Sequence, residues 1–126
     1  MKRFITFVVL MSAFVSFQAF AGCWSITDTY TGILEGESEK VAYGPFTITS
    51  TNGCLNANID ATITAVDRGR PPQLSIHKEI GSSWAQVAGN TGSNVLYSGS
   101  FGTYRVMIKN PDAAPKVYLG TVKYGR

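Results

Sequence analysis

The sequence predicts an all-β fold: a single antiparallel β-sandwich, jelly-roll-like, of about 7–9 strands, that follows a cleaved signal peptide. Three observations predict the sandwich. Apolar and polar residues alternate with a period of two from Trp24 onward. Clusters of Gly, Pro, Asn and Ser interrupt this alternation about every 8–14 residues, a spacing typical of short strands. No window of about ten residues after Ala21 has a 3.6-residue apolar stripe, so we expect very little helix.

Eight segments are expected to form strands. The clearest is 103–109, where Tyr104, Val106 and Ile108 occupy one side of the alternation. Segment 59–65 alternates Ile and Ala with Asp and Thr, which is typical of a half-buried strand with a polar outer face. Segments 74–80 and 117–124 repeat the pattern, and the other segments show it more weakly. In chain order the expected strands are 24–29, 41–50, 59–65, 74–80, 84–88, 94–97, 103–109 and 117–124.

Turn residues separate these segments. Residues 32–40 are expected to form an acidic loop or a short hairpin, and Gly53 can supply the positive φ of a turn at 51–53. The loop 67–72 ends in two prolines, which cannot donate to a sheet ladder. Gly-rich tips are expected at 89–93 and 98–102, and a turn at 110–115 precedes the last strand. The strands and turns together fill residues 22–126 with one domain.

Residues 1–21 have the layout of a secretory signal peptide. Lys2 and Arg3 precede an uncharged run, and the segment closes on Ala19-Phe20-Ala21, with small residues at the −3 and −1 positions of a cleavage site. An apolar run of about 14 residues is short for a membrane-spanning helix, which needs about 20. The residues around Cys23 also form a loose lipobox, so a lipoprotein cleaved before Cys23 is the alternative. We therefore expect an exported protein, periplasmic or extracellular.

Cys23 and Cys54 are the only two cysteines. An even cysteine count in an exported protein usually indicates a disulfide. Closing a loop of about 31 residues would stabilise the domain by roughly 3.7 kcal/mol in the chain-entropy model. If Cys23 carried a lipid instead, Cys54 would be an unpaired thiol in an oxidising compartment, and the domain would be tethered to a membrane. We expect the disulfide, and two cysteines without a nearby His partner predict no zinc site.

Net charge argues against a nucleic-acid partner. The whole chain carries +3, but Lys2 and Arg3 belong to the signal peptide. The remaining chain has nine basic residues against eight acidic ones, a net charge of +1. This small excess is too low for binding that is driven by phosphate contacts and counterion release.

Few residues could support catalysis. His77 is the only histidine, and the strand alternation places it on the solvent face beside Ser75 and Glu79. The acidic loop 32–40 lacks an apolar wall that would raise the pKa of a carboxyl group, and it lacks an Asp-x-Asp spacing for calcium. We therefore expect no catalytic residue, metal or cofactor, and a small hydrolase using His77 is a minor alternative.

Three side chains are candidates for binding. Trp84 follows Gly81-Ser82-Ser83 at an expected hairpin tip, where an exposed indole could stack on a sugar or dock a partner; packing in the core is its alternative role. Arg68 and Arg70 flank Gly69 ahead of two prolines and could present a basic loop, although a solvated loop is the simpler interpretation. The expected partner is a protein or a glycan.

Residues 61–124 resemble the bacterial pre-peptidase C-terminal domain. The similarity is carried by the segments Gln73-Leu74-Ser75-Ile76-His77, Trp84-Ala85-Gln86-Val87-Ala88, Gly102-Thr103-Tyr104-Arg105-Val106-Met107-Ile108 and Tyr118-Leu119-Gly120-Thr121-Val122. Where that family often has Asp-x-Asp before the first of these strands, this chain has Arg70-Pro71-Pro72-Gln73. The resemblance implies a jelly-roll-like β-sandwich of a kind found beside secreted peptidases, and it assigns no catalytic or binding residue.

These observations predict a non-enzymatic exported binding domain. An accessory protein of the cell envelope or the extracellular space, or an inhibitor-type protein, would fit them equally. Two alternatives remain: a carbohydrate-binding module that uses exposed aromatic side chains, and a structural subunit of an extracellular assembly.

Overall fold

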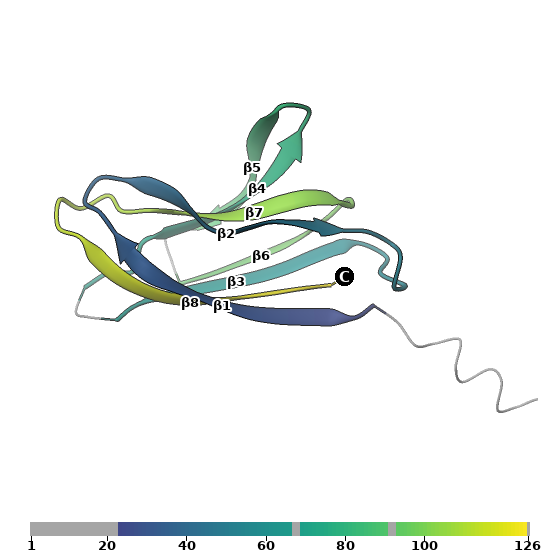
Figure 1. The fold of residues 1–126 in the computed structure, drawn as a ribbon, viewed down its shortest axis with the longest axis horizontal. Coiled ribbons are helices and arrows are strands. Elements are labelled where there is room, and N and C mark those ends of the chain that lie inside the picture. The colour runs from purple at the N-terminus through teal and green to yellow at the C-terminus, as the bar shows by residue number, and fades with distance from the viewer. Residues whose placement is uncertain (1–22, 67–68, 91–92, 126) are drawn as a thin grey trace, which may run out of the picture.

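The computed structural model describes residues 23–66, 69–90 and 93–125, and these residues form strands, turns and loops without a helix (Figure 1). The described part of the chain thus holds no helix long and apolar enough to cross a membrane. The signal-peptide prediction for residues 1–21 lies outside the described residues. The strands are β1 (Ser25–Leu34), β2 (Glu39–Ile48), β3 (Ala57–Ala65), β4 (Gln73–Ile80), β5 (Ser83–Asn90), β6 (Asn94–Gly99), β7 (Gly102–Lys109) and β8 (Lys116–Gly125).

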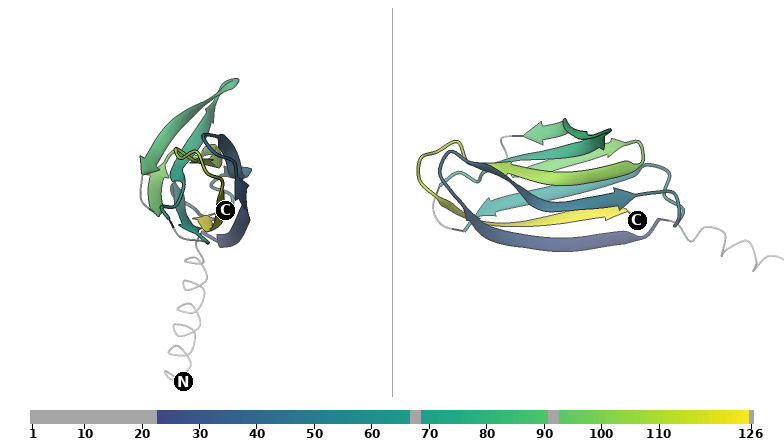
Figure 2. Two further views of the ribbon diagram at one scale, coloured as in Figure 1. Left: turned by 90° about the vertical axis from the view of Figure 1, so that its left-hand side faces the viewer. Right: turned by 45° about the horizontal axis from the view of Figure 1, so that its top comes forward.

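The eight strands form two four-stranded sheets that pack face to face (Figures 1 and 2). The sheet order is β1-β8-β3-β6 in one layer and β2-β7-β4-β5 in the other, and the strand pairs are antiparallel. Eight antiparallel strands in this order make a double-sheet jelly roll. The predicted fold class is confirmed, and the strand number lies within the expected range.

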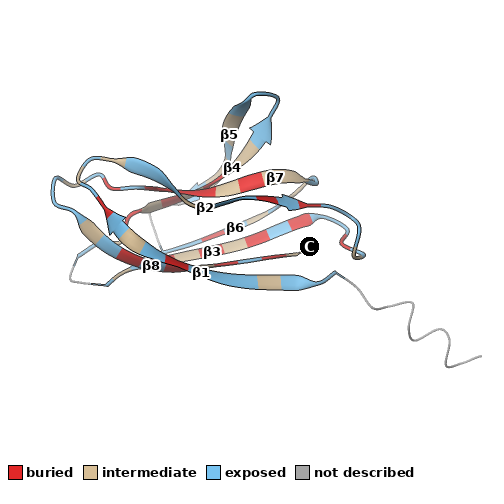
Figure 3. Cartoon of the chain, viewed as in Figure 1, coloured by how far each residue is buried: buried red, intermediate tan, exposed pale blue. Residues whose placement is uncertain are grey.

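Alternation along each strand builds the core between the sheets, visible as buried bands on the strands in Figure 3. Ala61 and Val122 are neighbours on the inner face of one sheet, and Ile76 and Val106 are neighbours on the inner face of the other. Aromatic rings connect the two layers. The ring centroid of Phe46 on β2 lies 4.3 Å from that of Tyr124 on β8. The remaining core members are Tyr30, Leu34, Ile48, Ala57, Ile59, Ile63, Leu74, Val95, Tyr104, Ile108 and Tyr118.

Gly120 on β8 leaves space for the side chain of Tyr30 to lie over β8. A Cβ at this position would lie 2.4 Å from the carbonyl oxygen of Thr62 and 2.4 Å from the Tyr30 ring. Tyr30 instead passes over the glycine, and its hydroxyl donates a hydrogen bond to that oxygen. Burial raises the pKa of the Tyr30 hydroxyl, so it remains a neutral donor at physiological pH.

The connection between β1 and β2 differs from the expected loop at 32–40. β1 continues to Leu34 and β2 begins at Glu39, so most of this segment is strand. The connection carries the chain from one sheet to the other, so it is not a hairpin. Glu37 adopts a positive φ of 53° there, and its amide donates to the carbonyl oxygen of Asp112 at 2.8 Å.

Asn110 joins this connection to the one between β7 and β8. Its side chain is fully buried, and its amide group donates to the carbonyl oxygens of Glu35 at 3.2 Å and Ala114 at 2.8 Å. The Asn110 side-chain oxygen accepts from the amide of Asp112 at 3.0 Å, and the Asn110 main-chain amide donates to Ser38 at 2.8 Å. One buried side chain therefore satisfies several backbone groups of two loops at this end of the sandwich.

Candidate functional site

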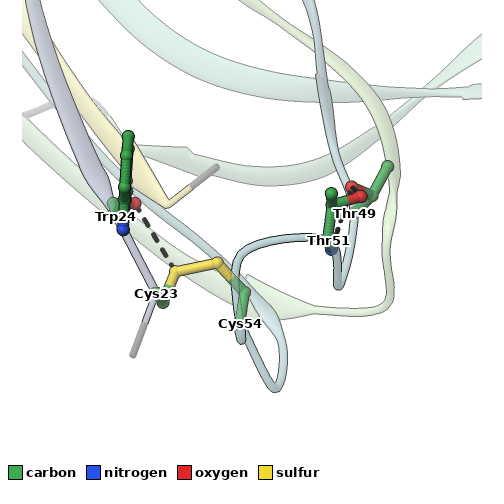
Figure 4. Close-up of a disulfide and its surroundings, with 5 residues drawn as sticks. All are labelled: Cys23, Trp24, Thr49, Thr51 and Cys54. Carbon is green, nitrogen blue, oxygen red and sulfur yellow. Dashed lines mark hydrogen bonds between the residues drawn. A yellow bond between two sulfur atoms is a disulfide. The ribbon is translucent and has the colours of Figure 1, made fainter. Parts of the chain in front are cut away.

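The disulfide between Cys23 and Cys54 lies at the opposite end of the sandwich from Asn110, where it links the start of β1 to the loop between β2 and β3 (Figure 4). The two Cα atoms are 4.3 Å apart, and the described residues include no free cysteine. Gly125 completes the packing, because a Cβ there would lie 2.4 Å from the sulfur of Cys23. The predicted pairing is confirmed. With its sulfur in this bond, Cys23 cannot carry a thioether-linked lipid.

Exposed apolar side chains surround the disulfide. Trp24 follows Cys23 and is 69% exposed, and Leu55 follows Cys54 and is 88% exposed. Because the cysteine Cα atoms are 4.3 Å apart and consecutive Cα atoms are about 3.8 Å apart, the Cα atoms of Trp24 and Leu55 lie within about 12 Å of each other. The cross-link therefore fixes two large apolar residues at one end of the sandwich.

Beside the disulfide, an open groove of about 650 Å³ crosses the outer face of the β1-β8-β3-β6 sheet. We call it the disulfide-end groove and define it by Trp24, Asn58, Asp60, Leu96, Lys123 and Gly125. Trp24 and Leu96, both 69% exposed, come from opposite edges of the sheet. Asp60 and Lys123 are direct neighbours on the two central strands. Asn94 donates to the Asp60 carboxylate at 2.7 Å and orients it. The groove thus combines two apolar walls with a floor that carries both signs of charge.

More apolar side chains are exposed farther along the same face. Ile33 and Val117 are cross-strand neighbours, and Leu119 lies two residues farther along β8. With Trp24 and Leu96, these residues account for five of the ten exposed large apolar side chains among the described residues. The other sheet contributes three on the same count: Val41 and Ile80 in its strands, and Phe101 directly before β7. Exposed apolar surface is therefore concentrated on one side of the sandwich.

The outer face of the β2-β7-β4-β5 sheet is different, because its depression is polar. It has a volume of about 530 Å³ and is lined by Glu39, Gln73, Leu74, Ser75, Gln86, Gly89 and Lys109. The β4–β5 hairpin rises from this sheet and its tip stands clear of the sandwich (Figure 1). The two outer faces of the protein therefore present different chemistry.

His77 and Arg105 lie side by side next to this depression, as cross-strand neighbours on β4 and β7. The His77 Nε2 atom lies 3.2 Å from the Ser75 hydroxyl. The buried Nδ1 of His77 and the buried Nε of Arg105 have no hydrogen-bond partner among the described residues. A buried polar atom left unsatisfied costs about 1–3 kcal/mol. Burial and the Arg105 charge lower the pKa of His77, so the imidazole is neutral at pH 7.

Trp84 lies at the start of β5, close to the predicted hairpin tip, but it is only half-buried rather than fully presented to solvent. Its indole covers the guanidinium of Arg105, whose Cζ lies 4.2 Å from the ring centroid. The hairpin therefore folds Trp84 back over the sheet. One face of its ring is occupied by Arg105, and a binding role for Trp84 stays a prediction.

One ion pair connects the basic loop to the rest of the domain. Arg70 is exposed, and its guanidinium lies 3.1 Å from the Asp112 carboxylate. Asp112 also pairs with Lys116 at 2.9 Å, and these contacts lower its pKa. Arg70 thus links the loop before β4 to the loop before β8, and Arg68 lies outside the described residues. The structure does not bring Arg70 together with Trp84 or with the disulfide-end groove.

Leu96 and Trp24 were not predicted to be binding residues. In the run Val95-Leu96-Tyr97 all three residues are apolar, so alternation alone cannot identify which one faces outward. Pairing shows that Leu96 shares a face with Asp60, whereas Tyr97 packs at the core. The signal that could have identified Leu96 as outward-facing is its position opposite the charged Asp60, and this position is known only once the strand pairing is known.

Among the described residues, no group of three or more His, Cys, Asp or Glu side chains could hold a metal ion. His77 forms its hydrogen bond with Ser75, and no carboxylate in the described part of the chain is hydrogen-bonded to the imidazole.

Several solved structures are similar to the chain, and two of them are informative about the comparison. One is a Yersinia pseudotuberculosis-derived mitogen, with a TM-score of 0.57 and 18% sequence identity over 81% of this chain and 86% of that chain. The other belongs to Bacillus endospore appendages described as a family of disulfide-linked pili, with a TM-score of 0.42 and 15% identity over 82% of this chain and 89% of that chain. No protein-family model and no curated protein match the chain. The first similarity supports the β-sandwich fold, and identities this low show nothing about function.

Proposed function

We propose that this protein is a non-enzymatic exported β-sandwich that binds a protein partner through the outer face of its β1-β8-β3-β6 sheet, with the disulfide-end groove at the centre of the contact. The observation that carries the proposal is the unequal distribution of exposed apolar side chains between the two outer faces. An exposed apolar patch rimmed by polar residues is typical of a protein-interaction site.

The groove has the composition of an interface centre. Trp24 supplies a large aromatic anchor, and Leu96 supplies an aliphatic one on the other side. Anchors of this kind carry most of the binding energy of protein interfaces, often 2 kcal/mol or more for each of a few residues. Asp60 and Lys123 add one charge of each sign, which favours a defined register of the partner over tight nonspecific binding.

Export is supported by two independent features. The disulfide is typical of proteins that fold in oxidising compartments. The pattern of residues 1–21 is that of a signal peptide, with cleavage expected after Ala21. The proposal covers a periplasmic and an extracellular protein alike.

The test is a quantitative capture experiment with the exported protein, residues 22–126. Wild-type protein and the Trp24→Ser/Leu96→Ser variant are immobilised and exposed to the envelope fraction and culture fluid of the source organism. Ile80→Ser serves as the matched control, because Ile80 is an exposed aliphatic residue of the other sheet, 57% accessible. We expect one partner to be retained by wild type and control and to be reduced at least about tenfold with the double variant.

Two results would contradict the proposal. A partner retained equally by all three proteins would show that it binds outside the disulfide-end groove. If no protein were retained above background, a protein partner would be excluded. If the retained protein is a second copy of this chain, the same face serves self-association. Sedimentation of wild type and double variant would then show concentration-dependent oligomers in the first only, as expected for a structural subunit.

A further inference from the structure

We infer that the outer face of the β2-β7-β4-β5 sheet holds a second binding site, one for a neutral saccharide, in the depression between β4, β5 and the ends of β2 and β7. This site is separate from the disulfide-end groove, because the two lie on the outer faces of different sheets. The proposal stands independently of the protein partner.

The lining has the hydrogen-bonding groups that sugar hydroxyls require. Gln73 and Gln86 each provide a carbonyl acceptor and an NH₂ donor, and Ser75 provides a hydroxyl that can act in both ways. Glu39 contributes an acceptor and Lys109 a donor. These two are cross-strand neighbours, yet they form no salt bridge among the described residues, so both heads can reach a ligand. The depression volume of about 530 Å³ lies within the range of roughly 300–1,000 Å³ for small-molecule sites.

Gly89 makes room for the Gln86 amide in the depression. A Cβ at this position would lie 2.4 Å from the side-chain nitrogen of Gln86 and 3.7 Å from the Cβ of Ser75. Gly89 is not among the glycines with a positive φ, so the backbone does not require glycine here. The missing side chain instead leaves space for the Gln86 amide to lie across the floor beside Ser75.

Charge selects the kind of ligand. Glu39 and Lys109 balance each other in the lining, and on the adjoining surface Arg105 is stacked against Trp84. An anionic ligand would meet the Glu39 carboxylate, and nothing in the lining besides Lys109 would compensate a phosphate or sulfate.

The test uses residues 22–126 on an array of neutral oligosaccharides of glucose, galactose, mannose and N-acetylglucosamine, together with sulfated and sialylated counterparts. Bound saccharides are then titrated by calorimetry against three variants. Gly89→Ala pushes the Gln86 amide out of the depression, and Gln86→Ala removes that amide. Asn56→Ala is the control, because it removes an exposed amide outside both sites. Thermal melting of each variant confirms that it is folded.

We expect neutral saccharides to bind wild type and Asn56→Ala with equal affinity, and to bind Gly89→Ala and Gln86→Ala at least about tenfold more weakly. The proposal would be overturned if wild type bound no neutral saccharide, if it preferred the sulfated or sialylated members, or if both variants kept full affinity. Should Gly89→Ala fail to fold, Gln86→Ala alone decides the outcome.

Discussion

Removing the disulfide should lower stability by a predictable amount. Cys23 and Cys54 are separated by 31 positions, and a cross-link closing a loop of that length is worth about 3.7 kcal/mol at 25 °C in the chain-entropy model. A Cys23→Ala/Cys54→Ala variant should therefore lose about 3.7 kcal/mol of unfolding free energy. For a domain of about 105 residues this corresponds to a fall in Tm of about 15 °C.

The assay is urea unfolding of the variant and of wild type, the latter with and without a reducing agent, followed by Trp fluorescence. Reduced wild type keeps both sulfur atoms, so it separates the cross-link from the packing of the sulfur atoms against Gly125. The double variant and reduced wild type should agree to within about 1 kcal/mol. A loss below about 1 kcal/mol in both would refute the reasoning, because it would show that the start of β1 is held by its other contacts and not by the cross-link.

Three further predictions concern stability. Asn110→Ala should lower the free energy of unfolding by about 2–3 kcal/mol, because it leaves buried carbonyl groups of two loops without a donor. The control Asn56→Ala should lower it only slightly. Both are measured by chemical unfolding, and equal losses would contradict the role of Asn110. Gly120→Ala should lower the free energy of unfolding by about 2 kcal/mol or more, because the new Cβ would lie 2.4 Å from a backbone oxygen. In the control Gly102→Ala, the new Cβ would approach only the flexible end of a lysine side chain. Similar Tm values for the two variants would contradict this prediction. Burial and a neighbouring guanidinium lower the pKa of His77 from its ordinary 6.5, so its contribution to stability is complete above that pH and is lost as the pH falls below it. The Tm of wild type should therefore fall more between pH 7.5 and pH 5.5 than the Tm of His77→Gln, and parallel changes would show that this pKa is not lowered.

Much of the fold was predictable because the chain is locally consistent. In β3 and β7 every second side chain is apolar and buried, so periodicity alone identifies the strand and its inner face. The disulfide followed from the count of two cysteines in an exported chain. The β1–β2 connection was less predictable. Its acidic residues suggested a loop, but pairing with β8 extends β1 to Leu34. Pairing with a strand that is distant in the chain cannot be predicted from the local sequence.

The candidate sites were harder to predict, because each depends on contacts across strands that are far apart in the chain. Leu96 forms a groove only together with Trp24 at the other edge of the sheet. Gln86 lies in the depression only because Gly89 leaves space for its side chain. Trp84 was recognised as a residue near a hairpin tip, but only the pairing of β4 with β7 brings Arg105 beneath its ring. The resemblance to the pre-peptidase C-terminal domain remains an expectation.

Binding of a protein partner at the outer face of the β1-β8-β3-β6 sheet is tested by site-specific photo-crosslinking. A photoreactive benzoyl-phenylalanine is placed at Leu96 in the disulfide-end groove or, in a second protein, at Ile80 on the other sheet, and each exported protein is irradiated with its envelope fraction and culture fluid. We expect a discrete protein adduct from position 96 that is absent from position 80 and is lost when Trp24→Ser is added. An adduct from position 80 alone, or equal adducts from both positions, would contradict it.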